Sequence, residues 1–198
     1  MENNMKSRFL VIFLCFVLWG IPSGAQNVAI KTNLLYDLTT TVNAGVELGL
    51  SPRWTLDVSA NYNAWTLSHD RKWKHWLVQP EARYWFCDPF AGHFLGFHLL
   101  GGQYNIGGLK NGLKFLGTDF SQLSDHRFQG WMAGAGVAYG YTWILGRYWN
   151  LEAEIGLGYI YSRYDKFECA GCGQKTETGQ PHHYLGPTKA AVNLIYVF

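Results

Sequence analysis

Two cysteines and two histidines lie near the carboxyl end of the chain, and these residue types form the ligand set of many structural zinc sites. Cys169 and Cys172 enclose an Ala-Gly pair, and His182 and His183 follow as neighbours. The spacing differs from that of the common zinc modules, and adjacent histidines seldom bind one ion. We therefore expect a small disulfide loop between Cys169 and Cys172 and no metal, with a zinc site as the alternative.

Two short runs contain the residue types of a serine hydrolase, namely Ser124-Asp125-His126 and Ser68-His69-Asp70. A catalytic triad depends on positions in space, and three consecutive side chains rarely adopt its geometry. We interpret both runs as polar loop residues, and we assign no catalytic residue and no cofactor.

A third group of candidate residues is charged and interrupts segments of alternating apolar residues. Glu47, for example, lies between Val46 and Leu48 but on the opposite face of an extended strand. The full set comprises Lys31, Glu47, Asp57, Glu81, Arg83, Glu152, Glu154 and Lys189. Charges in a sealed apolar core would carry a large desolvation cost, so their common face indicates a polar interior where acids and bases pair. We expect this interior to be a plug, with a proton or ion path as the alternative.

The elements that position these charges are strands, because alternation of period two dominates the chain and no helical periodicity of useful length occurs. It predicts eight strands, at residues 28–37, 41–50, 53–63, 75–86, 93–104, 128–145, 149–164 and 184–198. Short turns alternate with longer polar loops, the longest at 64–74, 105–127 and 165–183. This pattern is typical of an all-β, eight-stranded, antiparallel up-and-down transmembrane β-barrel, with turns toward the periplasm and loops outside.

Some details of the strands depend on single residues. In the fifth segment we favour Leu95, Phe97 and Leu99 facing outward and Gly96 and His98 facing inward, although the opposite register stays open. Pro80 cannot donate to a strand ladder, so we expect a local bulge there. The glycines predicted to face inward make room for long charged side chains or relieve strand curvature; they are Gly134, Gly136, Gly140, Gly156 and Gly158.

The apolar faces of these strands indicate contact with lipid. The chain is 17% aromatic and only 15% charged, an unusual balance for a soluble exported domain. Aromatic residues gather at both predicted barrel ends, as in the two belts of a membrane barrel. They are Trp54, Trp143, Trp149 and Phe198 at the periplasmic end and Tyr36, Tyr62, Trp76, Trp131 and Tyr161 at the outer end. In a secreted β-sandwich, the alternative fold, bulky residues would cluster in mid-strand instead.

The last strand has the features of a barrel-insertion signal. One face carries Thr188, Ala190, Val192, Leu194, Tyr196 and Phe198, and the other begins with Lys189, Ala191 and Asn193. We expect the terminal aromatic residues Tyr196 and Phe198 to be recognised by the machinery that inserts barrels into the outer membrane.

Residues 1–25 have the pattern of a signal peptide, with basic Lys6 and Arg8, an apolar run from Phe9 to Trp19, and small residues up to Ala25. The prediction is therefore a single barrel domain at 26–198, located in the outer membrane. After removal of Cys15 with the signal, Cys87 would remain as a free thiol. A formal charge of +2 gives no basic stripe for a nucleic acid.

Several stretches resemble a family of small Gram-negative outer-membrane barrels that is classified as a domain of unknown function. The matching stretches are Lys31 to Asp37, Gly45 to Leu48, Gly140 to Leu145, Trp149 to Glu152, Gly156 to Tyr159, Tyr164 to Lys166, Cys169 to Gly173 and Tyr184 to Lys189. The genes of this family are often found beside those of fimbrial-type adhesin subunits. The resemblance implies membrane placement and a fimbrial link, and it supplies no catalytic residues.

These observations predict a structural or accessory role at the cell surface, in the assembly or anchoring of fimbriae, through the outer loops 64–74, 105–127 and 165–183. Lipid partners are expected as well, because Trp65, Trp73 and Trp76 flank a basic loop, Arg71 to Lys74, that could contact lipopolysaccharide phosphates. The alternative function is that of a lipid A acyl hydrolase or acyltransferase, which would use histidine and serine at the outer lip. A passive channel is disfavoured by the filled interior.

Overall fold

The computed structural model describes residues 28–67, 71–108, 114–115, 118–119, 126–168 and 174–198. The predicted signal peptide lies outside these ranges, as do Cys169, Cys172, Ser68, His69, Asp70, Ser124 and Asp125, so the predictions made for them stay predictions. Within the described ranges, no helix is long and apolar enough to cross a membrane.

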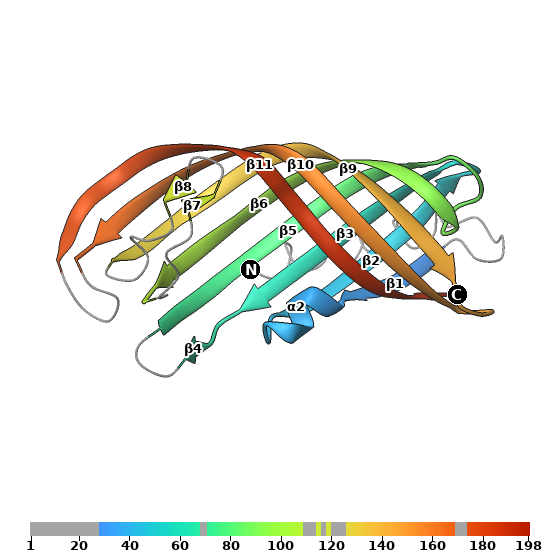
Figure 1. Cartoon of the computed structure of the whole chain (residues 1–198), viewed down its shortest axis with the longest axis horizontal. Coiled ribbons are helices and arrows are strands. Elements are labelled where there is room, and N and C mark those ends of the chain that lie inside the picture. Colours follow the sequence, from blue (N-terminus) through green and yellow to red (C-terminus); the bar gives the residue numbers. More distant parts are fainter. Residues whose placement is uncertain (1–27, 68–70, 109–113, 116–117, 120–125, 169–173) are drawn as a thin grey trace, which may run out of the picture.

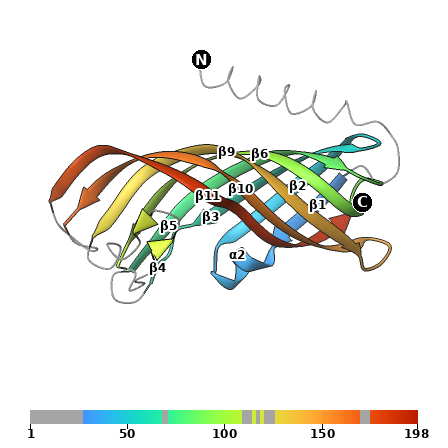
Figure 2. The same ribbon diagram turned by 45° about the horizontal axis from the view of Figure 1, so that its top comes forward.

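Eight long antiparallel strands form a closed ring in the described part of the chain (Figures 1 and 2). They are β1 (Val28–Asn33), β2 (Val42–Ser51), β3 (Trp54–Asn63), β5 (Arg71–Trp85), β6 (Gly92–Gly107), β9 (Arg127–Ile144), β10 (Trp149–Phe167) and β11 (Lys175–Val197). Each pairs with the next long strand, and β1 closes the ring against β11 from Ala29↔Val197 to Asn33↔Asn193. The predicted eight-stranded up-and-down architecture is confirmed.

Four short elements among the described residues lie toward the end of the ring opposite the C-terminus. Helix α2 (Leu34–Leu38) follows β1, the two-residue strand β4 (Thr66–Leu67) pairs with β5, and β7 (Lys114–Phe115) pairs with β8 (Thr118–Asp119). At the other end, where the chain terminates, the connections between strands are short turns (Figure 1). Strands β10 and β11 reach farthest from that end and curl beyond the other strands.

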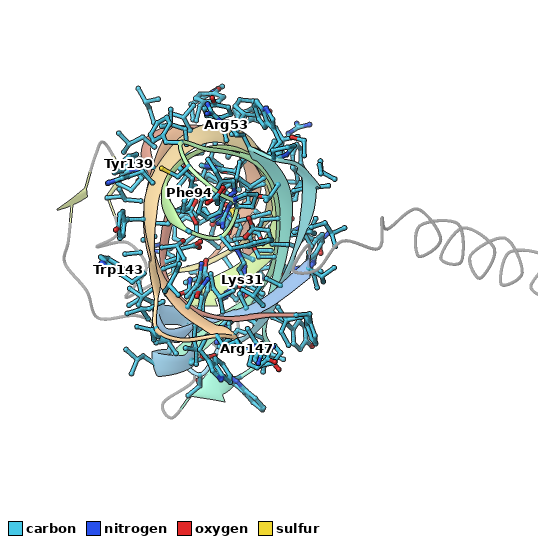
Figure 3. The ribbon with its side chains drawn as sticks, turned by 90° about the vertical axis from the view of Figure 1, so that its right-hand side faces the viewer. Lys31, Arg53, Phe94, Tyr139, Trp143 and Arg147 are labelled. Carbon is cyan, nitrogen blue, oxygen red and sulfur yellow. The ribbon has the colours of Figure 1, made fainter. Side chains whose placement is uncertain are left out.

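Side chains alternate between the inside and the outside of the ring along each strand. Figure 3 shows Lys31 and Phe94 inside the ring and Tyr139 and Trp143 on its outer surface. The favoured register of the fifth predicted segment, now β6, is confirmed, because Leu95, Phe97 and Leu99 are exposed whereas His98 is fully buried. The sandwich alternative is excluded, since the apolar residues line the outside and the charges line the inside.

The prediction for the first strand, residues 28–37, was wrong at its end, because β1 stops at Asn33 and helix α2 begins at Leu34. The Asn33 side chain accepts a hydrogen bond from the Leu35 N–H (3.1 Å), which is the capping contact that starts a helix. As a result, Tyr36 does not continue an outward-facing aromatic row. It lines a small interior cavity beside Lys31 and Asp57 instead.

The prediction that Thr188 faces outward on the last strand was wrong. The β10–β11 ladder shifts register between Gly156↔Lys189 and Leu157↔Pro187, which leaves Thr188 as an extra residue. Its hydroxyl lies 2.8 Å from Nε2 of the buried His98, inside the ring. A bulge of this kind reverses which residues of the strand face outward.

The bulge expected at Pro80 is not present in the described ladder. Val58↔Pro80 pairs in register on the β3 side, and on the β6 side the ladder continues from Val78↔Gly101 to Glu81↔His98 without a shift. Pro80 is therefore accommodated by a gap in pairing, not by an inserted residue.

Candidate functional site

Arg83 lies at the centre of the interior and is fully buried. Its Nε lies 2.6 Å from Glu81 Oε1, and its Nη1 lies 2.9 Å from both Glu47 Oε2 and Glu152 Oε2. Its Nη2 lies 2.9 Å from Glu154 Oε2. The planar guanidinium can serve several carboxylates at once, which a lysine ammonium does less well. One side chain thereby joins strands β2, β5 and β10.

Lys189 extends this network to the terminal strand. Its Nζ lies 2.8 Å from Glu81 Oε2 and 3.1 Å from Glu154 Oε1. Both carboxylates also contact Arg83, so each acid is shared between two bases. Strand β11 is therefore tied to β5 and β10 across the interior.

Lys31 completes the network from the first strand. Its Nζ pairs with Glu47 and lies 3.2 Å from Asp57 Oδ1. Among the described residues, Asp57 accepts no well-aligned hydrogen bond. Lys31, Arg83 (3.6 Å) and Lys189 (3.9 Å) hold it by charge alone.

The structure places all eight charged residues predicted for the interior inside the ring and brings them into one connected cluster. None of them is more than 8% exposed. The cluster holds five acids and three bases, and neutral donors compensate part of the difference. Asn193 Nδ2 donates to Glu152 (2.7 Å), Thr142 Oγ1 donates to the same carboxylate (3.1 Å), and Thr55 donates to Glu47.

An aromatic layer closes the interior on the side of the short turns. Trp85 and Phe94 are fully buried with ring centroids 4.8 Å apart, and Phe90 lies 6.2 Å from Trp85. Arg83 stacks on Phe94 at 4.4 Å, and Trp85 Nε1 donates to Thr55 Oγ1 (2.9 Å). The charged cluster thus lies against an aromatic layer. Arg83 contacts this layer by stacking on Phe94, and Thr55 links Trp85 to Glu47. Sequence reasoning missed this layer, although Trp85 follows Glu81 and Arg83 on the same face.

A layer of amides and a small cavity lie on the other side of the cluster. The cavity measures about 20 Å³, which is enough for a single water molecule. Its polar lining includes Asn33, Asn61, Gln79 and Asn193. The interior therefore consists of three stacked layers, and each of them is filled by side chains.

Inward-facing glycines provide space for the largest of these groups. A side chain at Gly140 would meet the Phe94 ring at 2.3 Å, and one at Gly136 or Gly156 would meet the His98 ring at 2.7 or 2.9 Å. Gly134 and Gly158 instead face neighbouring backbone, with carbonyl oxygens at 2.4 Å. Three of the five predicted glycines thus admit a large side chain, and two admit close strand contact.

This arrangement joins strands and gives no sign of a reaction centre. Arg83, Lys31 and Lys189 crosslink six strands through carboxylates, and the cavity beside them in the described part of the chain measures only about 20 Å³. Within the described ranges, no group of three or more His, Cys, Asp or Glu side chains is arranged to hold a metal ion.

The other candidate residues lie apart from this cluster. His183 is exposed on the outer face, where its Nδ1 is hydrogen-bonded to the Tyr159 hydroxyl. His182 is half-buried, with its ring 6.5 Å from that of Tyr164. Cys87 is an exposed free thiol in the turn before β6.

Comparison with known proteins adds a family and no activity. A family model described as a protein of unknown function (DUF3575) matches residues 10–198. No curated protein matches the chain, and no solved structure does.

Proposed function

The chain belongs to the DUF3575 family of proteins of unknown function, and we propose that it is an outer-membrane barrel with a closed interior that anchors or assists a partner, such as a fimbrial subunit, at the cell surface. The observation that carries this proposal is that polar and apolar side chains are distributed in the reverse of the way they are in a water-soluble protein. A filled ion-pair network occupies the inside, and large apolar side chains cover the outside.

The outer surface supports membrane placement. Val137, Ile155 and Leu157 are each about 60% exposed in mid-strand (61%, 60% and 57%). Water-soluble proteins seldom expose a continuous apolar surface of more than a few hundred Å². In a bilayer the same surface would be solvated by acyl chains, and each long strand pairs with the next around the ring.

The filled interior supports an anchoring role over transport. An eight-stranded barrel has just enough internal space for side chains. Here the aromatic layer and the charged cluster each span that space. A solute would have to displace Arg83 from four carboxylates to pass.

The outer end supports contact with a partner, because β11 has an unpaired edge there. Strand β1 covers only residues 193–197 of β11, and the Asn33 side chain bonds Ala190 O (3.3 Å) and Val192 N (3.3 Å) just beyond them. From Lys175 to Pro187, within the described residues, β11 pairs on one side only, with β10. Extended segments of partner proteins commonly bind to such edges.

Two measurements test this role. The first locates the tagged full-length protein by membrane fractionation, and recovery in the outer membrane is expected. The second identifies proteins that co-purify from gently solubilised membranes. A stoichiometric surface protein is expected, and it should be lost when a Gly-Ser linker replaces residues 165–183, which include most of the unpaired edge of β11.

A matched variant replaces residues 145–148, the turn at the opposite end, and should retain the partner. Both variants must show the heat-dependent gel shift of a folded barrel. A barrel that co-purifies with lipid alone would contradict the accessory role. A changed lipid A acylation pattern in deletion cells would instead favour the alternative, a lipid-modifying enzyme.

A further inference from the structure

Two adjoining hollows lie near the outer end of the barrel. Residues of β3, β5, β6, β9, β10 and β11 line the first, and residues of β5, β6 and β9 line the second. One measures about 720 Å³ and the other about 520 Å³. Trp76, Gln103 and Trp131 line both of them and form the boundary between them. These three residues are exposed and directly paired across the strands, as Trp76↔Gln103 and Gln103↔Trp131.

Small residues on the turn side of this boundary create the apolar hollow. Val78, Gly101 and Ala133 form the next outward-facing row, and Gly101 has no side chain to fill the space between Val78 and Ala133. An added Cβ at Gly101 would meet nothing within 4 Å. Pro80 and Leu99 continue the lining toward the middle of the barrel. The result is a groove along the β5–β6 seam with the apolar walls that an acyl chain requires.

The hollow on the loop side is lined by both polar and apolar groups and has an excess of positive charge. Lys74 and Arg163 line it, and among the described residues neither has an acidic partner within ion-pair distance. Asp165 is the one carboxylate among the described residues that line it, and Lys175 already engages this carboxylate (2.7 Å). A phosphate group would therefore find two cations available.

Neutral groups in the same hollow suit a sugar. Asn105 and Gln129 are directly paired on β6 and β9, and both line the hollow together with Tyr62. The Oδ1 atom of Asn105 is shielded from solvent and accepts no hydrogen bond from a described residue. Amide groups can bond sugar hydroxyls, while Tyr62 and the two tryptophans offer flat apolar faces.

We propose that these two hollows form one binding site for a membrane lipid with a phosphorylated saccharide head group. One acyl chain lies in the groove over Gly101, and Trp76 and Trp131 flank the junction between chain and head group. Lys74 and Arg163 contact the phosphate, and the amides contact the sugar. The inference rests on the proposed membrane placement and assigns a ligand class to a defined part of the outer surface.

The test measures lipid binding to the purified full-length barrel in detergent by native mass spectrometry. The probes are lipid A bisphosphate, the same lipid without phosphates, and dioleoyl phosphatidylethanolamine. Gly101→Leu fills the groove, and Ala60→Leu adds the same bulk at an outward position on β3. A second variant, Lys74→Gln with Arg163→Gln, removes the positive charges. The heat-dependent gel shift verifies that every variant is folded.

We expect one tightly bound lipid A bisphosphate per barrel. Gly101→Leu should weaken binding at least about tenfold, and Ala60→Leu should leave it within about twofold. The charge variant should lose about tenfold or more for the bisphosphate and little for the dephosphorylated lipid. Equal affinity of wild type and Gly101→Leu, or no preference over phosphatidylethanolamine, would overturn the site.

Failure of this site can be distinguished from failure of the proposed function. A barrel that fractionates with the outer membrane but binds the three lipids equally would retain its anchoring role and lose the site. A protein absent from the outer membrane would lose both.

Discussion

At the scale of single residues, Arg83 is the side chain on which the interior depends most. Replacing it with methionine would leave five buried acids with only Lys31 and Lys189. Removing one partner from a buried ion network typically costs about 3–5 kcal/mol, because the charges left behind stay desolvated. We expect Arg83→Met to lower the unfolding free energy by that amount, and Arg83→Lys to lose less because it keeps the charge.

The measurement is the urea concentration at which the folded gel band disappears. Arg53→Met serves as the control, because Arg53 lies in an exposed turn and, among the described residues, its side chain donates only to the Tyr84 hydroxyl (3.2 Å). Its effect should stay within about 0.5 kcal/mol. Equal stability of Arg83→Met and wild type would show that the network does not hold the ring together.

Gly96 provides a second test of the interior, which measures how tightly the side chains are packed around the charged network. An alanine there would place its Cβ 2.6 Å from the Glu81 carboxyl carbon, inside the network. Because that carboxylate is fixed by Arg83 and Lys189, it cannot move away freely. We expect a loss of about 1–3 kcal/mol in the same urea assay.

Gly146→Ala is the matched control for this change, since an added Cβ at Gly146 meets nothing within 4 Å. A Gly96→Ala variant as stable as Gly146→Ala would contradict this prediction, because it would mean that the Glu81 carboxylate can shift to accommodate the added Cβ.

Alternation along the strands was enough to assign all eight charged residues to the inside. It could not identify Phe90, which lies in the turn after β5 with a positive φ of 64° and turns back under the barrel. Its position depends on where the turn places it, and a period-two pattern carries no information about that. His98 was assigned inward, but its contact with Thr188 depends on a bulge in another strand.

At the scale of elements, the strand boundaries show where local pattern reaches its limit. Leu34 and Tyr36 continue the alternation of β1, so nothing in the pattern indicates that the strand ends at Asn33. The helix forms because Asn33 caps it and bonds the free edge of β11 at the same time. That second contact joins residues far apart in the sequence, and only the closed ring brings them together.

Pro181 and Pro187 protect the unpaired edge of β11. Both pair in the ladder with β10, opposite Arg163 and Leu157, so their nitrogens are expected to face the open side. Replacing both with threonine would add two N–H donors to that edge. Each new backbone hydrogen bond can contribute about 1 kcal/mol, so we expect self-association to strengthen by roughly tenfold or more.

Light scattering of the detergent-solubilised protein after size exclusion would measure this change. Pro52→Thr, in the β2–β3 turn, is the control and should leave the protein in its wild-type state. If the double variant showed no added self-association, the edge would be blocked by something other than its prolines.

At the scale of the whole molecule, the sequence was most informative about architecture. Eight segments of alternating residues, joined by connections that are alternately short and long, were sufficient to predict an up-and-down ring. This is because each strand in such a ring pairs only with its neighbours in the sequence. The hollows on the outside were not foreseen, since Trp76, Gln103 and Trp131 come from three strands. Their proximity follows from the register, which the positions of single residues do not reveal.

The filled interior leads to a prediction about the molecule as a whole. Ions crossing the barrel would have to pass the aromatic layer of Trp85, Phe94 and Phe90 and also the cluster around Arg83. Since either barrier occupies the full width, wild-type protein in a planar bilayer should give no current steps above the leak of the bare membrane. The double variant Trp85→Ala with Phe94→Ala should lose stability by about 3–5 kcal/mol or more and still not conduct, because the charged layer remains. Steady current through the wild-type protein would mean that the charged cluster opens, and the role would then shift from anchor to channel.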